Sequence, residues 1–100
     1  MTLEEIKQLV AQRRYRYSGK VRNFIEDGFF DETDLEHCIL SATRIHKSER
    51  DELGQALHGM KHIILGRDTR GQLFYTVGKV MAGPHGHFYF YITAHKADEP

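Results

Sequence analysis

The side chains best suited to acid–base chemistry lie in the C-terminal part of the chain. They are His95, Tyr75, Lys79 and Lys61, and all four fall in runs that predict β-strands. Cleaving RNA without a metal requires a group that accepts the 2′-hydroxyl proton, a group that protonates the departing oxygen, and cations that stabilise the charged phosphate. His95 or Tyr75 can transfer protons, and the two lysines can hold the phosphate. These four residues are therefore the candidate catalytic set.

Other aromatic and basic residues are candidates for contacts to a substrate. Tyr89 and Tyr91 offer flat rings on which an unpaired base can stack. Arg16 belongs to the basic run at residues 13–16, where arginine can contact phosphate. The same run also fits a solvated helix end, because cations suit the negative pole of a helix. Tyrosines and lysines are also common on the solvent face of a sheet, so a purely structural role is the alternative.

The seven histidines of the chain do not predict a metal site. His85 and His87, on either side of a glycine, are the pair closest in sequence. A protein metal site needs several convergent ligands, whereas the single cysteine, Cys38, falls in a predicted helix and His62 on the predicted core face. The glycines form no phosphate-binding loop. We therefore expect neither a metal nor another cofactor.

Three β-rich runs must position the candidate residues, at residues 60–67, 73–81 and 87–95. Each run is dense in β-branched and aromatic residues, and glycine-containing turns separate the runs, which predicts an antiparallel meander. A three-residue turn with a bulge fits both connections. In the first turn Asp68 then lies opposite Gln72. In the second turn Gly83 lies opposite His87.

This register gathers the candidate residues on one face of the sheet. Lys79 lies between Lys61 and Tyr91, and Tyr75 lies opposite His95. Because side chains alternate along a strand, these residues and Tyr89 point to the same side. Two ammonium groups opposite each other destabilise a sheet unless an anion lies between them, which indicates a phosphate site. The other side is the predicted core, which includes Ile64, Phe74, Phe88 and Phe90.

Helical patterns precede the strands, over residues 2–42. Thr2 and Ser18 fit helix N-caps, and a capping box at residues 33–36 predicts a third helix with Cys38 on its buried side. Residues 43–47 predict a short edge strand. The sheet then spans about residues 43–96. The order of elements predicts a single α+β domain over residues 1–100, with two or three helices packed on a three- to four-stranded antiparallel sheet.

Composition narrows the classes of function. The chain has 14 basic and 14 acidic residues, so it lacks the overall positive charge of most nucleic-acid binders, and any RNA site must come from a local patch. No apolar run approaches the ~18 residues that span a bilayer, so no membrane contact is expected. A single cysteine cannot form an internal disulfide, which agrees with a reducing compartment. We expect the protein to be cytoplasmic.

Several short segments resemble a widespread family of small prokaryotic proteins that is related to the RelE-type toxins. The segments are Tyr17-Ser18 at a helix start, Gly28 before the third helix, and residues 62–66, 73–77 and 91–95. Members usually carry Ser-x-His at the helix start, where this chain has Ser18-Gly19-Lys20, and Lys20 can keep a cationic role. The resemblance implies a ribonuclease-like toxin fold that is often encoded beside an antitoxin.

The residues and the resemblance together predict a RelE-like toxin that binds and cuts RNA without a metal. Lys61 and Lys79 would hold phosphate, while His95, helped by Tyr75, would move protons. The expected partners are RNA and a cognate antitoxin. The alternative is a catalytically inactive binding module that docks a protein partner or a small ligand on the aromatic face of its sheet. Substrate contacts would come from Tyr91, Tyr89, Lys20 and Arg16.

Overall fold

Capping residues fix where the three helices begin. The computed structural model describes residues 1–97. In it, α1 (Leu3–Ala11) follows Thr2, whose hydroxyl accepts a hydrogen bond from the Glu5 N–H at 3.2 Å, as predicted. Ser18 caps α2 (Gly19–Glu26) in the same way, through the Val21 N–H at 3.2 Å. α3 (Glu32–Ser41) begins slightly earlier than predicted, with Asp31 as its N-cap residue.

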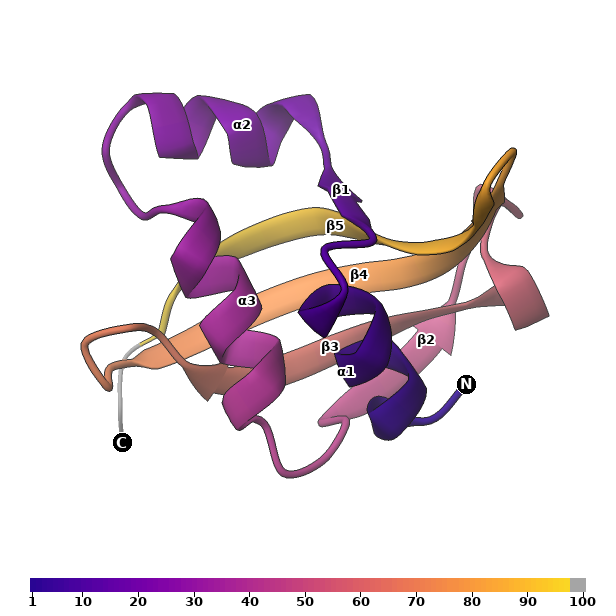
Figure 1. Ribbon diagram of the computed structural model, residues 1–100, viewed down its shortest axis with the longest axis horizontal. Coiled ribbons are helices and arrows are strands. Elements are labelled where there is room, and N and C mark those ends of the chain that lie inside the picture. Colours follow the sequence, from indigo (N-terminus) through magenta and orange to yellow (C-terminus); the bar gives the residue numbers. More distant parts are fainter. Residues whose placement is uncertain (98–100) are drawn as a thin grey trace.

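One five-stranded sheet supports the fold, in the order β1-β5-β4-β3-β2 (Figure 1). β3 (Met60–Arg67), β4 (Leu73–Gly83) and β5 (Gly86–Lys96) form the predicted antiparallel meander. β2 (Lys47–Arg50) adds an antiparallel edge strand, a little later in the chain than predicted. A short 3-10 helix, η1 (Leu57–Gly59), precedes β3.

β1 (Tyr15–Tyr17) makes the sheet mixed, which corrects the prediction of a fully antiparallel sheet. It pairs in parallel with residues 89–91 of β5, whereas the sequence pattern indicated a helix end at residues 13–16 and a helix start at Tyr17-Ser18. α1 ends earlier because Arg13 adopts a left-handed φ of 59°, and the Arg14 N–H then bonds the Leu9 carbonyl at 2.8 Å. The α+β class is confirmed, with three helices packed on a mostly antiparallel sheet.

The core lies between the helices and one face of the sheet. Figure 1 shows α1 and α3 in front of the strands, with α2 above β5, and contacts join α3 to β3 and β4 and α2 to β5. Apolar side chains of the helices pack against apolar side chains of the strands, and together they form one buried layer. Its fully buried members include Ile6, Val10, Leu35, Ile39, Ile64, Phe74, Tyr89 and Tyr91.

The β4–β5 hairpin has a shorter loop than predicted. Its loop is residues 84–85, so Gly83 pairs with Gly86 and not with His87. The bulge that was placed at this loop lies instead at Ile92, where the register of the two strands shifts. After the bulge, residues 93–95 of β5 therefore have the partners on β4 that the sequence predicted.

Between the loop and the bulge, the side chains of β5 point to the opposite faces from those predicted. A shift of one residue reverses the alternation of side chains along a strand. Tyr89 and Tyr91 therefore enter the core, where both are fully buried, and Phe88 and Phe90 leave it. Gly78 makes room for this packing, because a Cβ there would lie 2.5 Å from the Tyr89 hydroxyl oxygen.

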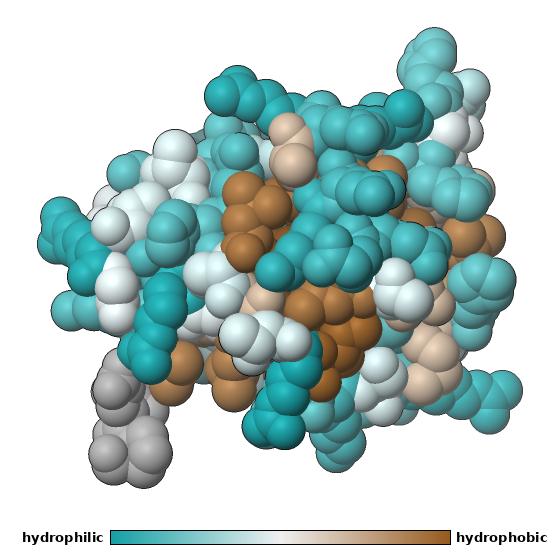
Figure 2. All heavy atoms as spheres, turned by 60° about the horizontal axis from the view of Figure 1, so that its bottom comes forward, coloured by the Kyte–Doolittle hydropathy of each residue, from teal (hydrophilic) through white to brown (hydrophobic). Residues whose placement is uncertain are grey.

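The surface holds few large apolar side chains. Those that are strongly exposed among residues 1–97 are Phe29, Leu40 and Leu53. On the face that Figure 2 shows, apolar atoms reach the surface in separate groups between hydrophilic side chains. No helix in this described part of the chain is long and apolar enough to cross a membrane.

Candidate functional site

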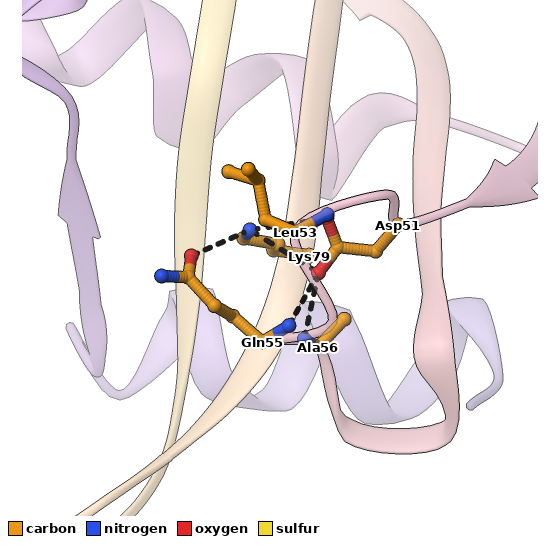
Figure 3. A network of polar contacts seen from close by, with 5 residues as sticks. All are labelled: Asp51, Leu53, Gln55, Ala56 and Lys79. Atoms are coloured by element: carbon orange, nitrogen blue, oxygen red, sulfur yellow. Dashed lines mark hydrogen bonds and ion pairs between the residues drawn. The ribbon is translucent and has the colours of Figure 1, made fainter.

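The predicted lysine pair does not form an open anion site. The β3–β4 register is the predicted one, but the ladder ends where His62 pairs with Gly78, one residue before Lys61 and Lys79. The Lys79 ammonium is buried and lies 3.3 Å from both carboxylate oxygens of Asp51 (Figure 3). The fold uses Lys79 in an ion pair, so Lys79 is not free to hold a phosphate.

Asp51 organises the loop that covers Lys79. Figure 3 shows its carboxylate between the lysine and the loop backbone, where it accepts the N–H groups of Leu53, Gln55 and Ala56 at 3.3, 2.9 and 2.8 Å. The Gln55 side-chain oxygen also accepts from Lys79 at 3.0 Å. Burial alone would raise the pKa of Asp51, but the hydrogen bonds and the ammonium outweigh it and hold this pKa below its ordinary value. The network therefore fixes residues 51–56 over this part of the sheet.

Tyr75 and His95 are the members of the predicted set that the structure brings together at the surface. They lie opposite each other on β4 and β5, as predicted, with ring centroids 4.5 Å apart and ring planes 20° from parallel. His95 is exposed and Tyr75 is half-buried. Lys61 lies apart from them, opposite Glu49 of the edge strand β2. The stacked pair therefore presents an oriented imidazole to solvent without either lysine beside it.

Tyr89 and Tyr91 cannot receive a base in this fold, which corrects their predicted role. Both rings are fully buried. The Tyr91 hydroxyl donates a hydrogen bond to the Leu35 carbonyl at 3.0 Å. The Tyr89 hydroxyl is buried with no hydrogen-bond partner among residues 1–97. The two tyrosines are thus core residues, one with its polar atom satisfied and one without.

We expect Tyr89→Phe to raise the free energy of unfolding by about 1 kcal/mol or more, because it removes a buried hydroxyl that has no partner. Tyr91→Phe is the matched control, since it removes a hydrogen-bonded hydroxyl from the same strand and should lower the free energy of unfolding by about 1 kcal/mol. Urea denaturation of both variants checks the prediction. Equal destabilisation by the two changes would contradict it.

A basic hollow forms where the α1–β1 connection meets the β4–β5 hairpin. It has a volume of about 250 Å³, and its charged or titratable lining residues, apart from Tyr15, are Arg13, Arg14, Arg16, His85 and His87. None of its lining residues is acidic. In a chain whose formal net charge is zero, this is a local concentration of positive charge. It is the kind of patch that an anionic ligand requires.

Arg14 joins the two walls of this basic hollow. Its guanidinium donates hydrogen bonds to the backbone carbonyls of His85 and His87, the second at 3.1 Å. Arg16 lies over the ring of Phe88, 5.1 Å from the ring centroid. Phe88 reaches this position because the short hairpin turned it out of the core. The unexpected register therefore helps to build the basic hollow.

Arg13 holds a backbone conformation that normally favours glycine. Its φ of 59° lies in the left-handed region, where a side chain costs roughly 1–2 kcal/mol. Arg13 follows the C-cap residue of α1, and the left-handed conformation there lets the Arg13 and Arg14 N–H groups bond the Val10 and Leu9 carbonyls at 3.0 and 2.8 Å. The sequence pattern indicated Arg16 as a phosphate contact but not the basic hollow, because Arg14 and His85 are 71 residues apart in the chain. The pattern of neighbouring residues in the sequence gives no signal for a contact between two segments that are so far apart in the chain.

The remaining candidates lie elsewhere. Lys20 is exposed in the first turn of α2 and does not line the basic hollow. His62 faces the core as predicted, with its Nδ1 2.8 Å from the Ser48 hydroxyl, and burial lowers its pKa. Cys38 is a buried core thiol as predicted, and burial raises its pKa to about 12. Within residues 1–97, no group of three or more potential ligands could hold a metal ion.

Of the predicted catalytic set, Tyr75 and His95 thus lie together at the surface, and the basic hollow lies at the other end of β5. Comparisons with family models, with curated proteins and with solved structures found no match to the chain. The likeness to the RelE-type family therefore stays a prediction from short sequence segments, beside an α+β fold that agrees with it only in class.

Proposed function

We propose that the protein binds single-stranded RNA and cuts it without a metal, as the toxin of a toxin–antitoxin pair. The observation that carries the proposal is the basic hollow, which combines three arginines and two histidines with no acidic lining residue. Guanidinium groups match phosphate geometry, and phosphate contacts supply most of the affinity for a nucleic acid. Phe88, in the same lining, is an aromatic side chain of the type that supports bases.

His95 is the proposed proton acceptor for cleavage. It would take the 2′-hydroxyl proton while the 2′-oxygen bonds to phosphorus, and Tyr75 would give a proton to the departing 5′-oxygen. His87 and His95 are eight steps apart on one strand, which corresponds to about 26 Å. An RNA strand held in the basic hollow would have to extend along the sheet to reach His95. The proposal therefore requires more than a dinucleotide as substrate.

The binding half of the proposal predicts two effects of the double variant Arg13→Gly/Arg16→Ala. The variant should bind RNA more weakly, and its affinity should depend less on the salt concentration. Removing one phosphate contact reduces the slope of log affinity against log salt by about 0.7, so the loss of both arginines should reduce it by about 1.4. Arg13→Gly also relieves the left-handed φ, so this half of the double variant should not destabilise the fold. Fluorescence anisotropy with a labelled oligouridine at several salt concentrations measures the effect.

A matched control removes the same charge from the opposite edge of the sheet. Lys47→Ala/Arg50→Ala changes two exposed cations on β2, which is the edge strand farthest from β1. It should leave both the affinity and the salt slope near those of the unchanged protein. If the two double variants weaken binding equally, the basic hollow is not the RNA site.

The cleavage half of the proposal is tested by incubating the protein with RNA in the presence of a chelator. His95→Ala should lower the cleavage rate by about 10²–10⁴-fold, whereas His46→Ala, another exposed histidine, should not change it. Induced expression should arrest growth, and His95→Ala should relieve the arrest while the fold survives. RNA that stays intact at high protein concentration would end the cleavage proposal without touching the binding one.

A catalytically inactive binding module is the second candidate function. The observation that favours it is that Lys79, Tyr89 and Tyr91 belong to the packing of the fold and not to an open site. This alternative predicts harmless expression and no difference between His95→Ala and the unchanged protein. The growth and cleavage measurements above therefore separate the two candidates.

A further inference from the structure

We infer that a cavity at the other end of β5 receives one unstacked base of the RNA strand. The cavity has a volume of about 360 Å³ and is lined by Phe24, Phe29, Phe30, Ala94, His95 and Lys96. This inference rests on the proposed function and adds what the protein recognises beyond phosphate. Single-stranded RNA offers bases that aromatic side chains can stack on, which a duplex does not.

The shape of the chain holds Phe29 at the rim of this base cavity. The turn after α2 passes through Gly28, whose φ of 81° favours glycine, and the Phe29 N–H then bonds the Phe24 carbonyl at 3.0 Å. The Phe29 side chain is 61% exposed, and its ring meets the Phe24 ring edge-on at 5.7 Å. The turn therefore places a large apolar ring at the surface, where a flat ligand can reach it.

The floor of the base cavity consists of buried, packed side chains. Phe30 is buried and its ring packs edge-on against Phe74 of β4, 5.2 Å between centroids. Ala94 is fully buried beneath the opening. A ligand therefore enters a preformed apolar site and does not have to create one. Preformed cavities of a few hundred Å³ with polar groups at the rim are typical of small-ligand sites.

Lys96 is the cation that lines the base cavity. Lys96 also lines an adjacent polar cleft, which contains Asp31, Asp34 and Asp68, and its charge helps to lower the pKa of Asp34. No residue that lines the base cavity is acidic. A nucleotide, with an aromatic base and a phosphate, fits a cavity with these features.

The same placement connects the base cavity to the proposed chemistry. His95 borders the base cavity and also stacks on Tyr75. A base seated against Phe29 would bring its neighbouring phosphodiester to His95. The base cavity would then select where the strand is cut, while the basic hollow holds the strand.

The test compares an oligouridine with a strand of the same length that has the sugar-phosphate backbone but no bases. The unchanged protein should bind the abasic strand more weakly, because that strand lacks both the base at Phe29 and any base that stacks on Phe88. Phe29→Ala removes the first of these contacts alone, so it should weaken oligouridine binding by about 5- to 150-fold, the worth of stacking one base, and leave the abasic strand unaffected. Leu53→Ala is the matched control, because Leu53 is 75% exposed and does not line the base cavity.

Each outcome decides between the two proposals. Equal binding of both strands by the unchanged protein would overturn the base cavity and leave RNA binding through the arginines intact. If neither strand binds, the proposed function fails, and titration with uridine monophosphate decides the base cavity. NMR shifts at Phe29 and His95 would then support it, and their absence would overturn it. If Phe29→Ala only turns a dimer into a monomer, the cavity is an interface between copies and the inference is wrong.

Discussion

Replacing Asp51 with alanine is expected to lower the free energy of unfolding by about 3–5 kcal/mol, because it strands a buried ammonium. The side chains of Lys79 and Asp51 are 2% and 4% exposed, so water cannot take the place of the missing partner. The change also removes the acceptor of the Leu53, Gln55 and Ala56 N–H groups. Urea denaturation of the variant and the unchanged protein measures the loss of stability.

The chain contains a matched control for this prediction. Lys47 and Glu49 form an ion pair with the same separation, 3.3 Å, but their side chains are 63% and 39% exposed. Because solvent screens such a pair, Glu49→Ala should lower the free energy of unfolding by at most about 1 kcal/mol. Asp51→Ala/Lys79→Met should recover much of the lost stability, since no charge is then buried alone. An Asp51→Ala effect as small as that of Glu49→Ala would show that the buried pair does not anchor the loop.

The same ion pair predicts how the difference in stability between the unchanged protein and Asp51→Ala depends on pH. The pKa of Asp51 is lower in the folded protein than its unfolded value of about 3.9, so the carboxylate stabilises the fold at pH values above about 3.9. This contribution is lost as the pH falls through the lower, folded-state pKa. The gap in stability between the unchanged protein and Asp51→Ala should therefore narrow below about pH 4. A gap that stays constant down to about pH 2 would contradict the assignment.

The parts of the fold that the sequence predicted are those that nearby residues decide. Thr2 and Ser18 cap helices because their hydroxyls reach N–H groups three residues later. The β3–β4 turn keeps its predicted register, with the Asp68 N–H bonding the Gln72 carbonyl at 2.9 Å and Gly71 at a φ of 80°. In each case the residues that fix the geometry lie within a few positions of one another.

The errors arise where distant residues decide between two locally acceptable choices. Residues 83–86 allow a loop of two or of three residues, and local turn preference alone does not choose between them. The packing of Tyr89 over Gly78 and the bonds from Arg14 to the hairpin carbonyls stabilise the shorter loop. Lys79 was misplaced for a related reason, since its partner Asp51 is 28 residues away. The candidate site changed because these long-range contacts decide which side chains stay at the surface.

Gly66→Ala is expected to destabilise the fold more than the same change at any other glycine except Gly78. An added Cβ would lie 2.7 Å from the Cys38 carbonyl carbon and closer still to its oxygen, so the backbone of α3 would have to move away from β3. Overpacking typically costs about 1–3 kcal/mol, and the destabilisation here should reach or exceed the upper end because the obstacle is backbone and not a flexible side chain. Urea denaturation measures this effect.

Gly19→Ala separates this steric effect from the general effect of replacing glycine. Gly19 is the first residue of α2, and an added Cβ there meets nothing within 4 Å. That change should be neutral or stabilise the fold by up to about 1 kcal/mol, because it reduces the freedom of the unfolded chain. If the two alanine variants prove equally stable, α3 does not pack against β3 at the described distance. The positions of Leu35 and Phe30, which depend on that packing, would then be wrong, and the floor of the base cavity with them.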